Sequence, residues 1–109
     1  MKTITSYDEY RQCLNEDAYS VFMYTTDTCL DCAYAERFMP ALEALYPTVH
    51  FYRVKRGDLL VAFKEEPIDG VPSFAIYKNG KRYGLYTNRY RKTVLEVKAF
   101  FDKTLNKNN

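Results

Sequence analysis

The stretch "TTDTCLDCAYAERF", residues 25–38, decides how this chain is interpreted. Cys29 and Cys32 stand in it with two residues between them, where an apolar run gives way to a helical pattern. The preceding run "AYSVFMYT", residues 18–25, is apolar and β-prone throughout, which is typical of a strand covered on both faces. Three roles are open for the two cysteines at this point: ligands of a zinc ion, a structural disulfide, or a pair that passes electrons.

The chain as a whole is predicted to be a single domain, residues 1–109, with a polar tail from about residue 106. Hydrophobic residues make up 47% and aromatic residues 17%, which is enough for a core and argues against disorder. The net charge of +2 is too balanced to favour nucleic-acid binding. The local basic run "NRYRK", residues 88–92, is interpreted as a solvated loop rather than a phosphate site.

The first residues, "MKTITSYDEY", contain no apolar segment of the kind found in signal peptides, and no run approaches the length of a membrane span. We therefore expect a cytoplasmic protein. Because thiols are kept reduced in that compartment, the structural-disulfide interpretation is weakened.

Before the cysteines, "KTIT" allows a very short strand, and Ser6 with Glu9 forms a capping box that opens a helix at 7–14. After them, helical spacing continues to Tyr46, with an internal proline. The apolar positions of this second helix are Ala35, Phe38, Leu42 and Leu45. A strand is predicted at 48–54 and a short helix at 58–66, with Asp58 as its N-cap.

Residues 71–87 are predicted to be two strands joined by Asn79-Gly80, a strong hairpin signal. Thr93 and Glu96 form a second capping box. They open a last helix whose inward positions are predicted to be Val94, Val97, Phe101 and Leu105. The resulting order β-α-β-α-β-α-β-β-α predicts an α/β fold: a mixed sheet with a central parallel part and a C-terminal antiparallel hairpin, flanked by four helices.

In this order of elements, the two cysteines lie at the junction between the central strand and the helix that follows it. The free N–H groups and the positive dipole end of a helix N-terminus stabilise a thiolate at Cys29. Cys32, about one turn later, can attack a mixed disulfide formed at Cys29. A lone C-x-x-C in such a context is read as a redox motif.

Zinc binding is disfavoured because a structural site needs four ligands, usually two such cysteine pairs. Only Cys13 and His50 remain as further candidates. We interpret Cys13 as a small buried apolar residue and His50 as a packed or edge-strand histidine, and we expect no bound metal.

Val71-Pro72 is the second clue, because a proline that opens an apolar strand is unusual unless the bond before it is cis. The C-x-x-C at a strand–helix junction, the "VPSFAIYKNG" segment about forty residues later and the closing amphipathic helix together resemble the thioredoxin family over nearly the whole chain. Within it, the pattern is similar to bacterial thioredoxin-like proteins whose active-site dipeptide ends in Asp.

The resemblance implies that Cys29 attacks, Cys32 resolves, and Pro72 is a cis proline packed beside them. Val71 would offer its backbone to a substrate strand by β-augmentation. It also implies a redox-active Cys29–Cys32 disulfide that a thioredoxin-reductase-type electron donor reduces with electrons from NADPH. The sequence contains no nucleotide-binding motif, so we expect no bound cofactor. Disulfide-containing proteins would be the substrates, and we expect a monomer without nucleic-acid or membrane partners.

The chain departs from the family pattern at several positions. Thr28 stands where an aromatic residue usually precedes the first cysteine, Leu30-Asp31 replaces Gly-Pro, and Met23 replaces a buried acid. Pro40 falls about one turn later than usual. We expect Leu30 at an exposed tip where, like Thr28, it contacts substrate.

Asp31 has two possible effects. Its charge disfavours a Cys29 thiolate by about 1 kcal/mol, which favours a reductase over a strong oxidant. Its carboxylate could also take the proton of Cys32, which makes Asp31 a candidate catalytic residue. It is a better candidate than water or Asp27 because it is nearer in the sequence, and the alternative is that Asp31 is only an acid at the start of a helix. The sequence thus favours a protein-disulfide reductase; the alternative is a thioredoxin-fold binding or adaptor module with idle or regulatory cysteines.

Overall fold

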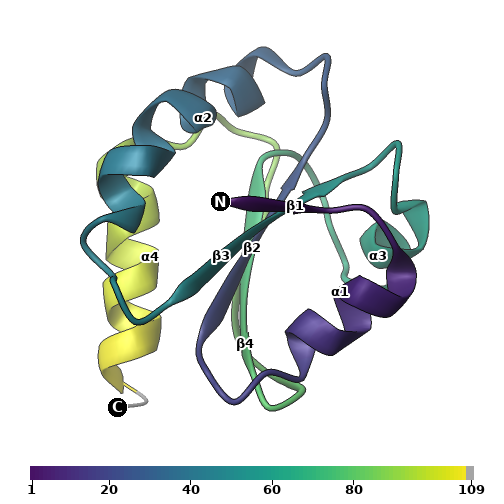
Figure 1. The fold of residues 1–109 in the computed structure, drawn as a ribbon. Helices are drawn as coiled ribbons and strands as arrows, with labels where there is room; N and C mark the ends of the chain where they lie inside the picture. The colour runs from purple at the N-terminus through teal and green to yellow at the C-terminus, as the bar shows by residue number, and fades with distance from the viewer. Residues whose placement is uncertain (108–109) are drawn as a thin grey trace.

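The computed structural model describes residues 1–107 of the chain, and the side chains of residues 1–106 (Figure 1). In chain order, its elements are β1 (Lys2–Ile4), α1 (Tyr7–Leu14), β2 (Ser20–Thr25), α2 (Leu30–Glu43), β3 (His50–Lys55), α3 (Leu60–Glu65), β4 (Ser73–Lys78), β5 (Lys81–Tyr86) and α4 (Val94–Lys107). None of the described helices is both long and apolar enough to cross a membrane. The polar tail predicted from about residue 106 falls on the end of α4 and on residues 108–109, which lie outside the described residues.

The five strands form one mixed sheet in the order β1-β3-β2-β4-β5. The pairs β1–β3 and β2–β3 are parallel, whereas β2–β4 and β4–β5 are antiparallel. Every residue of β2 is buried, as expected for a strand in the middle of the sheet with both faces covered. The predicted α/β architecture with four flanking helices is confirmed.

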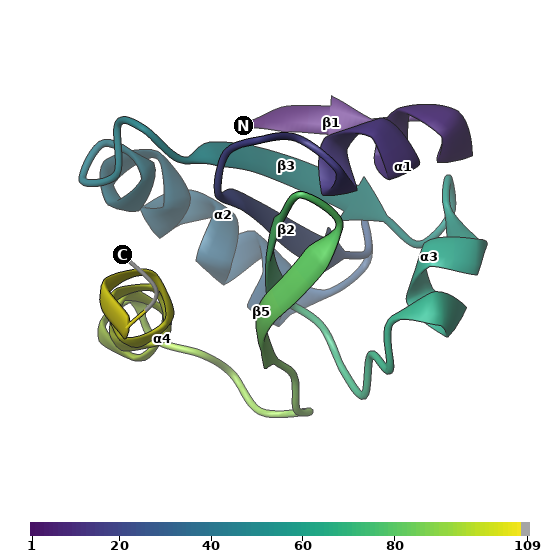
Figure 2. The ribbon, with the colours of Figure 1, turned by 90° about the horizontal axis from the view of Figure 1, so that it is seen from below.

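Two helices cover each face of the sheet: α1 and α3 lie on one side, α2 and α4 on the other (Figures 1 and 2). Alternate side chains of β2 supply the two cores. Phe22 and Tyr24 belong to the core under α1 and α3. Val21 and Met23 belong to the core under α2 and α4. Met23, which stands where the family pattern has a buried acid, is fully buried in this core.

The β4–β5 hairpin turns at Asn79-Gly80, as predicted. Both residues have positive φ angles, 53° and 77°, the combination that a two-residue type I′ turn requires. The turn is also tied to the rest of the fold, because the N–H of Asn79 donates to the carbonyl of Glu16 and that of Gly80 to the carbonyl of Leu14, both at 2.9 Å.

Both predicted capping residues cap their helices, but only the second pair forms the full reciprocal box. In the second, the Glu96 N–H donates to Thr93 Oγ1 at 3.2 Å and the Thr93 N–H donates back to Glu96 Oε1 at 2.9 Å. In the first, the Glu9 N–H donates to Ser6 Oγ at 3.1 Å, but the Glu9 carboxylate accepts from the N–H of Thr5 at 3.2 Å rather than from Ser6. Each pair satisfies backbone donors that the helix itself leaves free.

The prediction that Asp58 caps α3 is wrong. The N-cap is Leu59, and no side chain caps this helix. The N–H groups of Asp58 and Leu59 both donate to the carbonyl of Lys55, at 3.1 and 3.0 Å, in a turn that follows β3. Leu59, only 6% exposed, is buried in the core under α1 and α3. Burial of this leucine therefore shifts the helix start one residue beyond the position that a polar cap would give.

Two residues predicted to point inward are exposed. Leu45 is 58% exposed because α2 ends at Glu43 and the chain then turns, with the Tyr46 N–H donating to the Glu43 carbonyl at 3.0 Å. Val94, the first residue of α4, is 37% exposed because the buried positions of that helix begin one turn later, at Val97.

Candidate functional site

The first cysteine is the residue that caps α2. Cys29 has extended backbone geometry, and its Sγ accepts the N–H of Cys32 at 3.2 Å. The sulfur therefore lies at the N-terminal end of α2, beside the free N–H groups of its first turn. Cys29 is partly exposed, whereas Cys32, already inside the helix, is only 2% exposed. Both cysteines, like Cys13, are free thiols in this structure.

Val71 and Pro72 lie beside Cys29 although they are more than forty positions away from it in the sequence. The bond between them is cis, as predicted. The Cys29 thiol donates to the carbonyl oxygen of Val71 at 3.7 Å. Pro72 is buried, while Val71 is partly exposed at the surface. Four of the predicted site residues are therefore brought together here.

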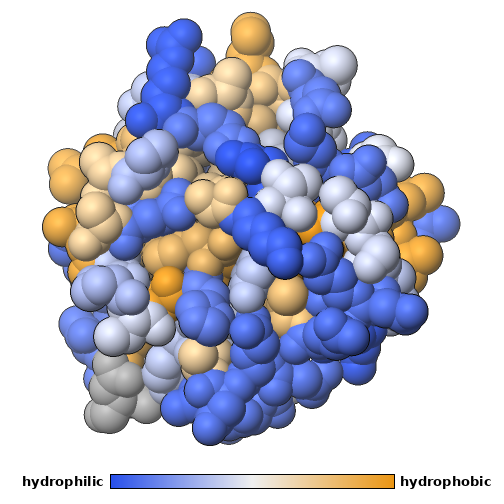
Figure 3. Space-filling model, in the orientation of Figure 1, coloured by the Kyte–Doolittle hydropathy of each residue, from blue (hydrophilic) through white to orange (hydrophobic). Residues whose placement is uncertain are grey.

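Thr28 and Leu30 flank the first cysteine on the outside of the molecule. Both are exposed, and Leu30 reaches 82% exposure. Figure 3 shows isolated hydrophobic groups among hydrophilic ones along the upper edge of the molecule, where α2 begins in Figure 1. An exposed leucine at this point is available to contact another molecule.

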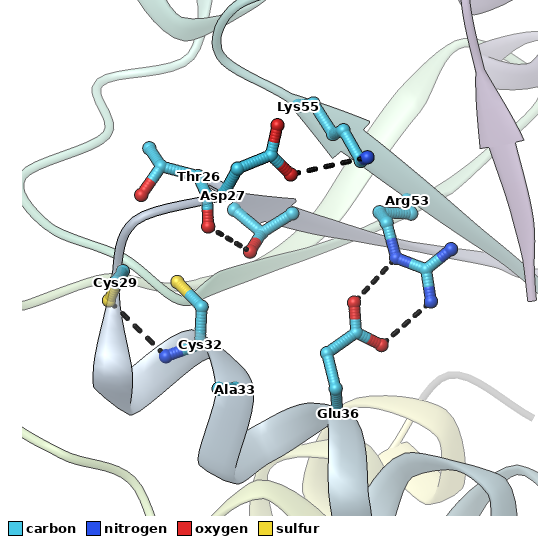
Figure 4. A pocket seen from close by; sticks show the side chains of 9 residues that line it. Thr26, Asp27, Cys29, Cys32, Ala33, Glu36, Arg53 and Lys55 are labelled. Atoms are coloured by element: carbon cyan, nitrogen blue, oxygen red, sulfur yellow. Dashed lines mark hydrogen bonds and ion pairs between the residues drawn. The ribbon is translucent and has the colours of Figure 1, made fainter.

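A cavity of about 360 Å³ opens beside Cys32 (Figure 4). Most of the residues that line it are polar or charged: Thr25, Thr26, Asp27, Cys29, Cys32, Ala33, Glu36, Arg53 and Lys55. Across it from the cysteines, Arg53 of β3 donates to the Glu36 carboxylate of α2 from Nε at 2.6 Å and from Nη2 at 2.7 Å. Lys55 pairs with Asp27 at 3.2 Å. The buried thiol of Cys32 thus faces a space that has room for water and is lined by two ion pairs.

Burial raises the pKa of Cys32 to about 11, and hydrogen bonding with Cys29 acts in the same direction. A hydrogen bond from the side chain of Thr25 opposes this effect by stabilising the thiolate. At neutral pH Cys32 is therefore a neutral thiol. Cys29, at the helix N-cap, is the more exposed of the two thiols.

Asp31 does not line the cavity but pairs with Arg91 from the loop before α4. The Nε of Arg91 donates to Asp31 Oδ1 at 3.0 Å. The same guanidinium lies 4.8 Å from the ring centroid of Tyr34, within the range of a cation–π contact. Asp31 therefore forms an ion pair with Arg91, a partner that the sequence did not reveal.

Several residues at this site escaped sequence reasoning. Arg53 left one signal, since a charged residue stands in the otherwise apolar "FYRV" of a predicted strand, but its partner Glu36 left none. Arg91 and Lys92 were assigned to a solvated loop. That interpretation is wrong for Lys92, which is 1% exposed.

The remaining candidates lie away from the cysteine pair. Cys13 is buried in the core under α1 and α3, and burial raises its pKa. His50 Nδ1 lies 3.3 Å from Glu16 Oε2. Among the described residues, no group of three or more His, Cys, Asp or Glu side chains is arranged to hold a metal ion.

No family model matches the sequence. Two curated proteins of Arabidopsis thaliana align with 75% of the chain: "Inactive TPR repeat-containing thioredoxin TTL3" at 28% identity and "TPR repeat-containing thioredoxin TTL4" at 27%. The aligned region covers only 12% of the length of either relative.

Solved structures resemble the chain over almost its whole length. Thioredoxin from Trypanosoma brucei brucei has a TM-score of 0.81 at 22% identity, covering 96% of this chain and 87% of its own. Mitochondrial thioredoxin 3 from Saccharomyces cerevisiae has a TM-score of 0.80 at 19% identity, covering 94% of each chain. The similarity to bacterial thioredoxin-like proteins and the role of Leu30-Asp31 as an active-site dipeptide stay predictions. The sheet order, the capped cysteine pair beside a cis proline and these likenesses agree: the chain has the thioredoxin fold.

Proposed function

We propose that the chain is a thiol–disulfide oxidoreductase that reduces protein disulfides through a mixed disulfide at Cys29, which Cys32 then resolves. The position of the Cys29 sulfur carries the proposal. It caps a helix, lies 3.2 Å from the Cys32 N–H, and is partly exposed beside the Val71 carbonyl. A thiolate in this position is both stabilised and accessible to a substrate sulfur.

The reaction proceeds in two exchanges. The Cys29 thiolate attacks one sulfur of the substrate disulfide, so that a Cys29–substrate bond forms while the substrate S–S bond breaks and releases one thiolate. The Cys32 thiolate then attacks Cys29 Sγ, forming the Cys29–Cys32 disulfide and releasing the second substrate thiolate. The substrate gains two electrons and the cysteine pair loses them.

Cys32 has to lose its proton before the second exchange, and the cavity provides a route for it. Water in this space can take the proton, with the carboxylates of Asp27 and Glu36 in the lining. Asp31 lies outside this lining and is held by Arg91. We therefore infer that the proton leaves through the cavity, and that Asp31 acts on the site through its charge.

Substrate contacts are assigned to the residues around Cys29. The partly exposed backbone of Val71 is available to pair with an extended substrate strand, with Pro72 packed beneath it. Thr28 and Leu30 are exposed on the other side of the sulfur and would contact side chains of the substrate. Turnover needs a separate dithiol donor of the thioredoxin-reductase type, which draws on NADPH.

The alternative function is a binding or adaptor module that does not use its cysteines for turnover. One observation favours it: the relative TTL3 is described as inactive despite its likeness to this chain. The capped Cys29 next to a second thiol is an argument against it, since a docking surface has no need of either feature.

Turnover of a disulfide substrate separates the two functions. Reduction of insulin by dithiothreitol should be faster with the protein than without it, and Cys29→Ser should abolish the difference. Cys13→Ala is the matched control, because it removes a cysteine from the opposite core and should leave the rate unchanged. A wild-type protein that adds nothing to the dithiothreitol rate would favour the adaptor function.

A further inference from the structure

Lys92 is a buried cation in the loop between β5 and α4. It directly precedes Thr93, the residue that caps α4. Its side chain is 1% exposed, although lysine is almost never fully buried unless it is paired with an acid. The ammonium donates to the carbonyl oxygens of Asn88 at 3.2 Å and Tyr90 at 3.0 Å. Both of these hydrogen-bond acceptors are neutral carbonyl groups. The ammonium also lies 5.5 Å from the ring centroid of Tyr86.

The loop that holds this cation, residues 88–92, packs against both halves of the cysteine site. On one side, the Asn88 carbonyl approaches Gly70 so closely that a Cβ there would lie 2.3 Å from its oxygen. Gly70 directly precedes Val71. On the other side, Arg91 holds Asp31 in the first turn of α2. The buried ammonium is therefore held by a loop that contacts residues on both sides of the cysteine pair.

Opposing effects act on the charge of Lys92. Burial is the larger effect and lowers the pKa of Lys92, whereas the acidic groups that face it act to raise that pKa. Those groups come from α2 with its cap and from α4: Asp31, Cys32, Glu96 and Cys29. Both redox thiols are thus among the groups that raise the pKa of Lys92. Because such coupling is reciprocal, the cation favours their thiolate forms as much as they favour the cation.

We propose that Lys92 is a positioning residue of the redox pair, a fixed buried cation that stabilises the thiolates of Cys29 and Cys32. In the first exchange it increases the fraction of Cys29 that is nucleophilic. In the second it offsets the cost of ionising the buried Cys32. Because thiolates exist only in the reduced protein, Lys92 also makes the cysteine pair more oxidising than it would otherwise be. The inference builds on the proposed function, but ionisation of the thiols is measured without any substrate.

Lys92→Met removes the charge while keeping the length and apolar stem of the side chain. The pKa of Cys29, measured from the pH dependence of its alkylation, should rise by roughly half a unit to one unit, and the reduction potential should become more negative. Lys103→Met, which removes an exposed lysine from α4, is the control for net charge and should leave both values unchanged. A folded Lys92→Met protein with the wild-type pKa and potential would overturn the proposal.

A second measurement uses the wild-type protein, and so remains decisive if the variant does not fold. The side-chain Cε resonance of Lys92 is followed by NMR against pH in the reduced and the disulfide-bonded forms. Oxidation removes both thiolates, so the pKa of Lys92 should be lower in the oxidised protein. Equal pKa values of Lys92 in the two forms would show that it does not sense the thiols. Either outcome is independent of whether the chain reduces insulin, which separates this inference from the proposed function.

Discussion

Arg91 forms an ion pair with Asp31, with its Nε 3.0 Å from Asp31 Oδ1, across sixty positions of the sequence. Asp31 directly precedes Cys32 in the sequence. Without a positively charged partner, its carboxylate would destabilise a thiolate on Cys29. The arginine places a positive charge against it, so the field that the cysteines experience is that of a pair. The side chains are 57% and 32% exposed, and solvent screens the pair further.

The first prediction concerns this pair. Arg91→Met leaves the charge of Asp31 uncompensated, so the pKa of Cys29 should rise, by less than about one unit at such an exposed site. Arg91→Lys keeps the charge and should come closer to the wild type. Ultraviolet absorbance of the thiolate against pH measures the effect.

Asp31→Asn is the converse change. It should lower the pKa of Cys29 and make the reduction potential more oxidising, by no more than about 30 mV. An unchanged or raised pKa in this variant would mean that the Asp31 charge does not reach Cys29.

The second prediction follows from the pKa of about 11 that burial gives Cys32. Below this value the fraction of Cys32 thiolate grows with pH, so resolution of a mixed disulfide at Cys29 should accelerate almost tenfold per pH unit between about pH 7 and 9. Release of a coloured thiol from a preformed mixed disulfide reports the rate. A rate that is flat over this range would contradict a buried Cys32 with a raised pKa.

The third prediction concerns the close approach between Gly70 and the loop before α4. In Gly70→Ala the new Cβ would lie 2.3 Å from the Asn88 carbonyl oxygen and 2.8 Å from Arg89 Cα, and both are backbone atoms that cannot rotate away. We expect a loss of about 2 kcal/mol in the free energy of unfolding, and slower thiol exchange because Val71 is displaced.

Gly57→Ala is the matched control, because nothing lies within 4 Å of a Cβ added there. It should be as stable as the wild type or slightly more so. Urea unfolding of the two variants makes the comparison, and equal stability of both would contradict the packing described here.

The fourth prediction tests a buried carboxylate remote from the cysteines. Glu66 is 3% exposed, and it accepts hydrogen bonds from Tyr77 and, at 2.6 Å, from Arg82 Nη1. Arg82→Met should cost about 2 kcal/mol, below the usual range for a fully buried pair because the Arg82 side chain is 41% exposed. Denaturant unfolding measures it, with Arg89→Met, which removes an exposed pair, as a control that should change little.

The sequence predicted the fold well where the signal is local. Asn79-Gly80 specifies its own turn geometry, and Thr93 with Glu96 satisfies the first backbone donors of a helix within four residues. Asp58 shows the limit of such reasoning: a good capping residue is not used because burial of Leu59 decides where α3 begins.

The candidate site was predictable in its cysteines and proline but not in the charges around them. Arg53 meets Glu36 because β3 lies beside β2 and beneath α2, and Arg91 meets Asp31 across the whole chain. These contacts depend on how elements far apart in sequence are placed in space. Lys92 is the clearest example of a residue whose environment was not predictable. Its burial depends on the path of its own loop, and no feature of the segment "NRYRK" predicts it.

The account rests on Cys29 as the attacking thiol and Cys32 as the resolving one, and trapping of the intermediate tests this most directly. Cys32→Ser, mixed with a disulfide-bonded peptide at neutral pH, should retain one peptide per chain, attached at Cys29 and stable over the time in which the wild type releases it. Mass spectrometry of the intact protein and of its proteolytic fragments identifies the attachment site. No adduct, or an adduct at Cys13 instead of Cys29, would contradict the account.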